Sequence, residues 1–515
     1  MSRRLKILLG LGIVLIVAVL IPVIRHYQLR AATEAYIAQL KAQGEPMDLA
    51  EVIPPPVPPE RNSADTLRKA AELIDADTHL DYTNYAYGME MVAPGKAIVC
   101  WHQSDVRDRD GTNSWESVVA AVGQNAQSFA LLRQIVDRPD FDFQINYDQV
   151  VADLNFTNFY LAVSKRAVQR LETAALCDLH QGNTASAVTN ARAMLAIVKA
   201  MRNERLVISE LVRIAIASIS QGADWEILQS TNVTDEQLAE LQNDWASLDF
   251  IRGQENALEM ERVTQMITAN RWRKSSSALR ENLENWGDWG TMTNEATASG
   301  KVQIAIAAFK WRYWWSYPDE LKLIGGYQIA LETARRAETN YSLLSLVHEQ
   351  ENKIDKMGID ANSGTSSFLI VFRKIDLHSL MSSAIFPLSA IFNRVMVAET
   401  TRQMAIAAIA LKRYQLKHGN YPPYLNSLVP EFVPTVPLDP VDGQPLRYRL
   451  NADGSFLLYS VGENGRDDHG NPALRADTQL PNRYYSWQNH DALDWVWPQP
   501  ATESEIQNYY AHPPK

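Results

Sequence analysis

Paired carboxylates are the first residues in this sequence whose type and spacing could do chemistry. Asp108 and Asp110 lie two positions apart on the loop 104–111, and neighbouring carboxyl groups can serve as general acid and general base. Arg107 and Arg109 alternate with them, and such interleaved charges are typical of a solvated loop. We therefore expect a charged surface loop at this position.

Other residue types used in catalysis do not occur at the spacing that known mechanisms need. His348 and Glu349 begin like a zinc-protease helix, but Asn352 occupies the position of the second histidine, so two imidazoles cannot share one face. The segment 364–368 departs from the Gly-x-Ser-x-Gly turn that exposes a nucleophilic serine. None of the ten histidines pairs with another at metal-ligand spacing. The sequence therefore supports no enzyme class.

A region rich in aromatic residues raises an alternative function, that of an envelope hydrolase or a glycan-binding protein. Its aromatic residues are Trp272, Trp286, Trp289, Trp311, Tyr313, Trp314, Trp315 and Tyr317, and the nearby carboxylates are Glu281, Glu284 and Asp288. Exposed tryptophans beside two carboxyl groups about 5 to 10 Å apart would favour this function, and buried tryptophans would exclude it. The helical spacing of Trp311, Trp314 and Trp315 instead favours aromatic packing between helices.

Length and composition limit the classes to which the chain could belong. Its 515 residues exceed the size at which one hydrophobic core stops growing, so we expect two or more lobes. A net charge of −11 gives no basic surface for nucleic acid, and we expect no nucleic-acid partner. Cys100 and Cys177 have no metal-ligand spacing, which leaves two alternatives: small buried hydrophobes, or a disulfide in an oxidising compartment.

An uncharged apolar run from Ile7 to Ile24 predicts an N-terminal membrane helix, because about 20 apolar residues are needed to cross the bilayer core. Arg3, Arg4 and Lys6 precede the run and favour a cytoplasmic N-terminal tip. A cleaved signal peptide is the alternative, but the run is longer than the usual apolar region of such a peptide. We therefore predict a single-pass protein of the bacterial inner membrane, held there by this helix, with the bulk of the chain extracytoplasmic, in the periplasm.

Four segments follow from the pattern of charge, proline and hydrophobic spacing. Residues 1–28 form the predicted cytoplasmic tip and anchor, and residues 29–61 form a stalk and a proline-rich linker. Residues 62–396 form a helical domain, and residues 397–515 form a C-terminal lobe. The predicted fold class is mainly α, with a transmembrane helix, a large antiparallel helical body that is partly tetratricopeptide-like, and a small α+β lobe with an antiparallel hairpin.

The tetratricopeptide-like part is a helical hairpin predicted within residues 160–198. Apolar and small residues recur every three or four positions on both sides of Gly182, a residue that suits the left-handed cap of a helix. No clean repeat of about 34 residues continues along the chain. We therefore expect one or two such units and not a repeat array.

The C-terminal lobe begins with a predicted amphipathic helix over residues 398–417, which Gly419 ends. Residues 446–450 and 456–460 have the composition and alternation of strands. The connecting residues 451–454 end in glycine and form a turn, so the two strands are predicted to pair as a hairpin.

This order of elements resembles the C-terminal part of the major pseudopilin of type II secretion systems. In that family a helix ending in tyrosine is followed by Gly-x-Tyr-Pro, then by a Pro-x-Asp-Pro-x-Gly-x-Pro turn, and finally by a strand that ends in Tyr-Ser-x-Gly. The matching positions are Tyr414, Gly419, Tyr421, Pro422, Pro437, Asp439, Pro440, Gly443, Pro445, Tyr448, Tyr459, Ser460, Gly462 and Gly465. The resemblance covers about a fifth of the chain and implies a periplasmic lobe of pseudopilin type.

Two features distinguish the chain from a filament subunit of that family. The N-terminus lacks the family's processing signal, a glycine before Phe-Thr-Leu-x-Glu, and a large helical body precedes the lobe. Because function resides in sites and not in folds, the resemblance alone gives no activity. Our hypothesis is a membrane-anchored, extracytoplasmic interaction or scaffold protein with protein partners in the cell envelope, associated with a type II secretion or pilus-like system.

The resemblance also implies a structural calcium site. In the family, the loop after the last strand binds calcium through carboxylates and backbone carbonyls, which are the hard oxygen ligands that this ion takes. Here Asn464 replaces the family's aspartate, and Asp467, Asp468 and Asp494 could supply charge. We expect Ca²⁺ at this loop to be structural, and the alternative is a polar loop stabilised by its own turns.

Overall fold

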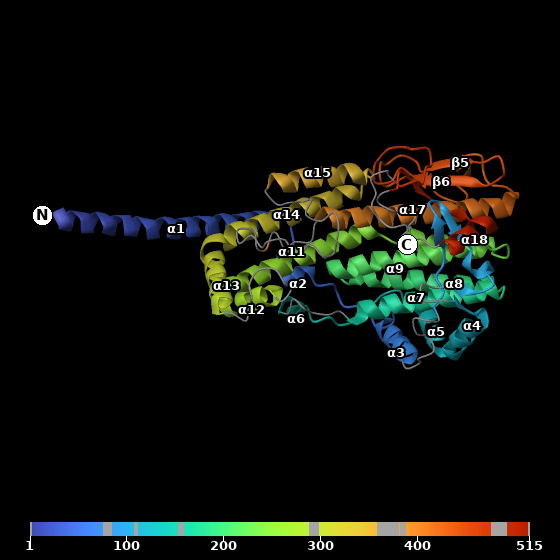
Figure 1. Ribbon diagram of the computed structural model, residues 1–515, viewed down its shortest axis with the longest axis horizontal. Coiled ribbons are helices and arrows are strands. Elements are labelled where there is room, and N and C mark those ends of the chain that lie inside the picture. Colours follow the sequence, from blue (N-terminus) through green and yellow to red (C-terminus); the bar gives the residue numbers. More distant parts are fainter. Residues whose placement is uncertain are drawn as a thin grey trace.

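The computed structural model describes residues 3–75, 85–107, 112–152, 159–287, 298–357, 381, 388–474 and 492–512. The long helices lie along the long axis of the molecule (Figure 1). Helix α1 (Arg3–Ala42) projects from one end, and a small sheet-containing lobe lies towards the other (Figure 1). The described part of the chain is mainly helical with small sheets, which confirms the predicted class at that level.

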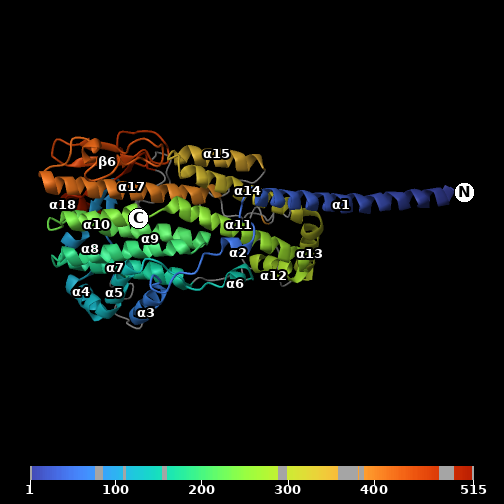
Figure 2. The same ribbon diagram turned by 180° about the vertical axis from the view of Figure 1, so that it is seen from behind.

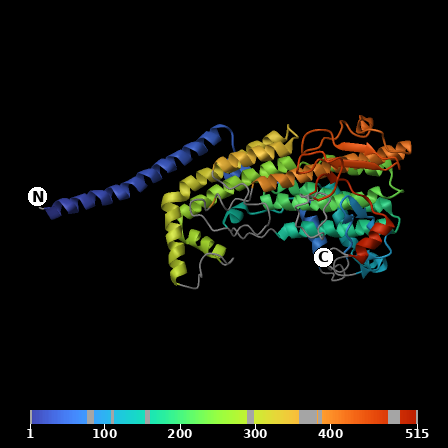
Figure 3. The same cartoon turned by 45° about the horizontal axis from the view of Figure 1, so that its top comes forward.

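Helix α1 is a single helix of 40 residues. Its N-terminal part extends away from the molecule, and its C-terminal part contacts α14 (Ser316–Ala337) (Figure 3). At this contact the Thr33 hydroxyl donates a hydrogen bond to the carbonyl of Tyr317, with 3.3 Å between the oxygens. The predicted anchor and stalk are therefore parts of one continuous helix.

The prediction of a membrane-spanning segment is wrong. Among the residues that the structure describes, no helix is long and apolar enough to cross a membrane. A crossing needs about 20 consecutive apolar residues, whereas the described side chains of α1, which lie beyond residue 19, include Arg25, Arg30 and Glu34. The fold class therefore loses its transmembrane helix. The predicted single-pass location in the bacterial inner membrane, with the body in the periplasm, is wrong for the same reason.

The helices of the body fall into a shorter and a longer group. The shorter helices are α2 (Leu49–Val52), α3 (Ala64–Asp75), α4 (Trp115–Gln124), α5 (Ala126–Arg133), α6 (Tyr147–Ala152), α10 (Asp235–Ala246), α12 (Ser276–Gly287), α13 (Ala298–Lys310) and α15 (Leu343–Lys356). The longer helices are α7 (Phe159–His180), α8 (Thr184–Ala200), α9 (Val207–Leu228), α11 (Phe250–Lys274), α14 and α17 (Leu388–His418). Seen from behind, α7, α8 and α9 lie side by side (Figure 2).

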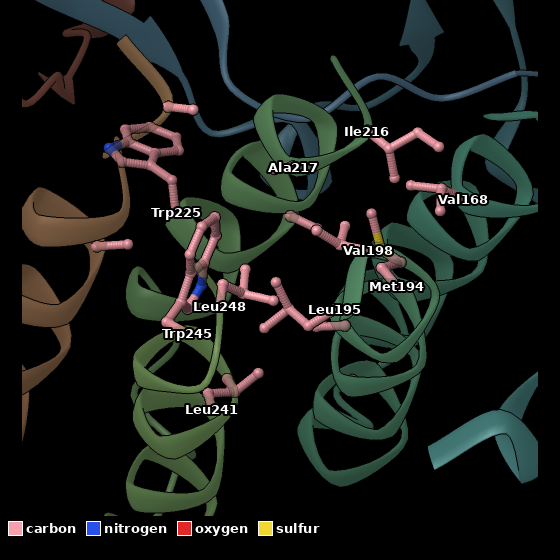
Figure 4. Close-up of a cluster of buried hydrophobic side chains, with 14 of the residues drawn as sticks. Val168, Met194, Leu195, Val198, Ile216, Ala217, Trp225, Leu241, Trp245 and Leu248 are labelled. Atoms are coloured by element: carbon pink, nitrogen blue, oxygen red, sulfur yellow. The ribbon is translucent and has the colours of Figure 1, made fainter. Parts of the chain in front are cut away.

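The main core forms where α7, α8, α9 and α10 meet. The turn at Gly182, with φ of +78°, joins α7 to α8, and the two helices pack together, so the predicted helical hairpin is confirmed. Ala174 and Ala191 are buried within this pair, and small side chains let the backbones approach closely. Figure 4 shows apolar side chains that meet in this core, and it labels Val168, Met194, Leu195, Val198, Ile216, Ala217, Trp225, Leu241, Trp245 and Leu248.

A second core cluster lies between α11, α13 and α14. Trp272, Trp311 and Tyr327 contribute aromatic rings to it, and the two tryptophan rings meet edge-on with centroids 5.8 Å apart. The π-helical turn η5 (Trp311–Trp315) connects α13 to α14 and points the Trp311 ring inward. The Trp311 indole N–H donates to the Asp319 carboxylate at 2.8 Å, so its polar atom is satisfied inside the core. Aromatic packing between helices is confirmed for these two tryptophans.

The C-terminal lobe contains an antiparallel sheet in the order β5-β6-β7, with strands β5 (Arg447–Leu450), β6 (Phe456–Ser460) and β7 (Trp495–Val496). Leu450 pairs with Phe456 across the first two strands, which confirms the predicted hairpin. The 3-10 turn η7 (Leu425–Leu428) follows α17, and the sheet lies against that helix, towards the end of the molecule away from α1 (Figure 1).

Three small strands apart from the β5-β6-β7 sheet form a second sheet that the sequence did not predict. Strands β1 (Glu90–Ala93) and β2 (Lys96–Ile98) form a hairpin, and β8 (Gln499–Pro500) pairs with β2 in parallel. Strands β3 (Val106–Arg107) and β4 (Thr112–Asn113) form a separate pair, and α18 (Glu503–Ala511) contacts β1. Segments near both ends of the chain therefore share one sheet, and α17 itself spans the predicted division at residue 397.

Candidate functional site

Asp439 is the centre of the turn that leads into the lobe sheet. Its side chain is fully buried. The Ser460 hydroxyl donates to Oδ1 at 2.8 Å, and the backbone N–H groups of Val441 and Val461 donate to Oδ1 and Oδ2 at 3.0 Å. Burial raises the pKa of Asp439 to about 6. This carboxyl group therefore ties the turn to the end of β6, and its oxygens are occupied by donors of the chain itself.

Arg447 supplies the positive charge beside this turn. Its guanidinium binds the Asp442 carboxylate, with the closest nitrogen and oxygen 2.5 Å apart, and lies 3.3 Å from Asp439 Oδ2. The hydrogen bond to Asp442 raises the pKa of Arg447, so the cation is retained. Charge in the turn is thus neutralised within the lobe.

Asp494 occupies a similar position under the loop that follows β6. Its side chain is fully buried, and it accepts hydrogen bonds from the backbone N–H groups of Gly470 at 2.8 Å, Asn471 at 3.0 Å and Asp468 at 3.3 Å. Burial raises the pKa of Asp494. A carboxylate that receives several backbone N–H donors organises the loop around itself.

Of the four residues predicted to bind calcium, the structure brings three together. The Asn464 amide donates to Asp468 Oδ2 at 2.9 Å, and the backbone of Asp468 reaches Asp494. Asp467 is directed elsewhere, since it accepts hydrogen bonds from the Tyr459 hydroxyl and from the backbone N–H of His469, both at 2.9 Å. The predicted ligand set is therefore split between two local networks.

The loop with Asn464, Asp468 and Asp494 does not present a preformed set of oxygen ligands for calcium. Calcium takes six to eight oxygen ligands, whereas both oxygens of Asp494 already face backbone N–H groups. Within the described ranges, no group of three or more histidine, cysteine, aspartate or glutamate side chains is placed to hold a metal ion. The calcium site stays a prediction, and the polar network of this loop is made by the chain's own donors.

A glycan would need an exposed aromatic platform, but some of the residues predicted for that platform are buried. Trp272 and Trp311 are 4% and 0% exposed, whereas Trp314 is 44% exposed. Glu281 lies at the surface of α12. Tyr313 is also exposed, and Trp315 and Tyr317 are half-buried. The side chains of Trp286, Trp289, Glu284 and Asp288 lie outside the described part of the chain. Two of the tryptophans are therefore core residues.

A basic cavity of about 380 Å³ lies beside this aromatic region, between α1, α11 and the start of α14. Its lining consists of His26, Arg30, Thr33, Glu34, Ile37, Asn270, Arg273, Lys274, Arg312, Tyr313, Tyr317 and Glu320. Sequence reasoning missed this cavity because its lining comes from three segments that are far apart in the chain. The only local signal is the cluster of cations at the end of α11, from Arg271 to Lys274.

Two buried glutamates form a further cluster that the sequence did not reveal. Glu172 accepts hydrogen bonds from the Gly88 N–H at 3.1 Å and from the Tyr85 hydroxyl at 3.2 Å. Glu226 accepts from the Cys100 N–H at 3.1 Å. Burial raises the pKa of Glu172 to about 8 and that of Glu226 to about 7. Glu172 on α7 binds the segment before β1, and Glu226 on α9 binds the residue that follows β2 by two positions, Cys100. Both carboxyls therefore have a structural role.

The glycine between these carboxyls, Gly88, is closely packed. A Cβ atom on Gly88 would lie 3.2 Å from Glu226 Cγ and from the backbone of Gly222. Contacts this short are rarely tolerated between atoms that cannot move. Cys100, whose thiol lies nearby, and Cys177 are both free, and burial raises the pKa of each thiol, so neither is activated as a nucleophile.

The remaining chemistry-bearing motifs add no site. His348 lies on α15, and its neighbour Glu349 pairs with Arg336 and Lys353 at the surface. The acidic loop with Asp108 and Asp110 and the segment 364–368 lie outside the described residues.

No family model, curated protein or solved structure matches this chain. The resemblance to major pseudopilins therefore stays a prediction from the motif residues. The function has to be argued from the chain's own surfaces.

Proposed function

We propose that this chain is an interaction or scaffold protein whose helical body presents a pseudopilin-like lobe to protein partners of a type II secretion or pilus-like assembly. The chain would act beside such an assembly and not as a subunit of its filament. The proposal depends on the motif resemblance for the kind of partner and on the lobe's geometry for the mode of action.

Rigid attachment of the lobe to the body supports a scaffold role. The Gln242 amide donates to the carbonyl of Phe432 at 2.6 Å, and the Trp225 indole donates to the carbonyl of Pro498 at 2.8 Å. Arg413 of α17 binds Asp235 of α10 at 2.7 Å. The Gln242 and Trp225 contacts are buried and fix orientation, because breaking either one leaves an unsatisfied group. A partner bound to the lobe would thus be held in a defined direction relative to the body.

The observation that carries the proposal is the exposed Tyr424 side chain on this fixed lobe. It is 72% exposed, and its loop is held against the hairpin by a 2.6 Å hydrogen bond from the Tyr448 hydroxyl to the carbonyl of Pro422. Other exposed large apolar side chains in the described part of the lobe are Leu416, Leu438 and Leu450. Tyrosine on a preorganised surface is typical of protein interfaces.

Site-specific crosslinking tests this function. A photo-crosslinking residue would be placed at Tyr424 in the full-length chain, expressed in the native host, and the products identified by mass spectrometry. The matched control places the same group at Lys69, an exposed residue of α3 on the far side of the body from the lobe sheet (Figure 1). We expect secretion or pilus-type components in the Tyr424 products and not in the Lys69 products.

Two outcomes would contradict the proposal. Identical products from both positions would show non-specific capture, and products without any secretion or pilus-type component would remove the proposed partner class. A Tyr424→Ala variant provides a second measure, since it should weaken recovery of the same components while leaving the circular dichroism spectrum unchanged. The alternative hydrolase or glycan-binding function gains no specific support from the two buried tryptophans.

A further inference from the structure

The basic cavity between α1, α11 and α14 differs in charge from the molecule as a whole. The chain carries 60 acidic and 49 basic residues. The cavity reverses this balance, because Arg30, Arg273, Lys274 and Arg312 line it against only two carboxylates, Glu34 and Glu320. An excess of cations in one cleft of an acidic protein concentrates a positive potential at that place.

One of these arginines is held rigidly by its neighbours. Arg273 binds Glu320 through two nitrogens, at 2.7 and 3.1 Å, and its guanidinium lies 4.6 Å from the centre of the Tyr317 ring. His26 stacks edge-on against the same ring at 5.1 Å, and its Nδ1 lies 2.8 Å from the carbonyl of Tyr313. These contacts form a preorganised wall, which reduces the entropy lost when a ligand binds.

The other cations of the cavity have N–H groups that are not engaged in these contacts. Arg30 reaches Glu34 through Nε alone, and Arg312 places Nε and Nη2 on the carbonyl of Arg273. An arginine has five N–H donors, so each retains donors on another terminal nitrogen. Lys274 is exposed and has no partner within the described residues. The cavity therefore holds several convergent donors in excess of its own acceptors.

We infer that this cavity binds an organic phosphomonoester. Four cations against two carboxylates leave an excess of two positive charges, and a phosphomonoester carries about −1.5 to −2 charges at pH 7, with three strong acceptor oxygens. A monovalent carboxylate would neutralise only half of that excess. The volume of 380 Å³ also leaves room for a small organic group beside the phosphate, at the lower end of the range for ligand sites.

The geometry assigns separate roles to the lining residues. Lys274 and Arg30, whose side chains are exposed, contribute the donors that contact the phosphate oxygens, and Arg273 and Tyr317 form the fixed wall. The phosphate could belong to a soluble metabolite or to a phospholipid headgroup, since both present the same group. The experiment distinguishes these two sources.

Binding would be measured on the purified full-length chain by isothermal titration with glycerol 3-phosphate, and by flotation with vesicles of phosphatidylcholine alone or with phosphatidic acid added. The test variant is Lys274→Gln combined with Arg30→Gln. The control variant is Lys310→Gln combined with Lys322→Gln, which removes the same charge from neighbouring elements outside the cavity lining.

We expect binding that the test variant weakens at least ~10-fold and the control leaves within about twofold, because each charge-assisted contact to phosphate is strong and geometry-dependent. Titration with glycerol 3-phosphate would identify a soluble ligand, and binding only to vesicles containing phosphatidic acid would identify a headgroup. The inference is overturned if neither probe binds, or if both double variants weaken binding equally. Since this test uses purified protein and no secretion component, its outcome is independent of the proposed function.

Discussion

The carboxyl groups of Asp439 and Asp494 in the C-terminal lobe differ from the cations of the basic cavity beside α1 in whether the chain itself supplies their partners. In the lobe, Asp439 and Asp494 are fully buried and receive hydrogen bonds from the chain's own N–H and O–H groups. In the cavity, Lys274 and the terminal nitrogens of Arg30 exceed the acceptors around them. This difference indicates that charged groups whose partners all come from the chain itself stabilise the fold. A cluster with unpaired charge is instead suited to binding a ligand. Four changes would test this distinction.

The largest expected effect is that of Asp439→Ala. The change leaves the donors of Ser460 and of the Val461 backbone buried without an acceptor and removes a partner of Arg447, so we expect a loss of about 3–5 kcal/mol in the free energy of unfolding. Urea denaturation followed by tryptophan fluorescence measures it. The control Asp453→Ala, in the exposed hairpin turn, should have a far smaller effect. Equal effects would show that the buried network is not structural.

A smaller effect on the free energy of unfolding is expected in the cavity, where Arg273 has a structural role and the neighbouring Lys274 does not. Arg273→Ala leaves Glu320, whose side chain is 4% exposed, without its cation, and should cost about 2–3 kcal/mol of unfolding free energy. Lys274→Ala should change it by less than about 0.5 kcal/mol, as is usual for surface sites without partners. The same denaturation experiment compares the two variants. A strongly destabilised Lys274→Ala protein would contradict the assignment of Lys274 to ligand binding.

Glu172 extends the comparison to a buried carboxyl group that has no cation beside it. Its pKa is about 8 in the fold against an ordinary value of 4.5, so the unfolded chain loses this proton first as the pH rises. The contribution of Glu172 to the free energy of unfolding should therefore be fully present below pH 4.5 and fall up to about pH 8, by about 1.4 kcal/mol for each pH unit. Glu226 acts in the same direction up to about pH 7.

The variant Glu172→Gln should flatten this dependence without removing it. Urea midpoints measured from pH 5 to pH 8 give the slopes of the variant and of the unchanged chain. The control Glu60→Gln, at an exposed position of the proline-rich segment, should keep the original slope. A Glu172→Gln protein with the original slope would show that this carboxyl group is already ionised in the fold.

The smallest expected effect is that of calcium. Because Asp494 already receives three backbone N–H groups, adding calcium or a chelator should shift the melting temperature of the full-length chain by less than about 1 °C. A rise of several degrees with calcium would show that the loop rearranges to release its carboxylates. It would then support the ligand set implied by the pseudopilin resemblance.

Local elements could be predicted from the sequence because their causes are local. Gly182 adopts the left-handed conformation that ends α7, and the strands on either side of Gly454 pair as their alternation indicates. The inward position of Trp311 also follows from its helical spacing. In each case the residues that determine the structure lie within a few positions of one another.

Features made by distant segments could not be predicted in this way. Glu172 meets Gly88, and Arg273 meets the residues of α1, only after the helices have packed. The apolar run near the N-terminus predicted a membrane helix on hydropathy alone, and the described helices do not bear that out. Of the predicted calcium ligands, Asn464, Asp468 and Asp494 do meet, but as hydrogen-bond partners of the loop.

The pairing of β8 with β2 has a consequence for the synthesis of the chain. The Gln499 N–H donates to the carbonyl of Gly95 and the Ala501 N–H donates to that of Ala97, so a segment synthesised long after β1 and β2 completes the sheet that these two strands begin. Trp225 likewise gains its hydrogen-bond partner only when Pro498 arrives. The edge of β2 that pairs with β8 therefore cannot form this pairing until residues 499–500 have been synthesised, and a nascent chain arrested before residue 498 would carry an incomplete body as well as an incomplete lobe.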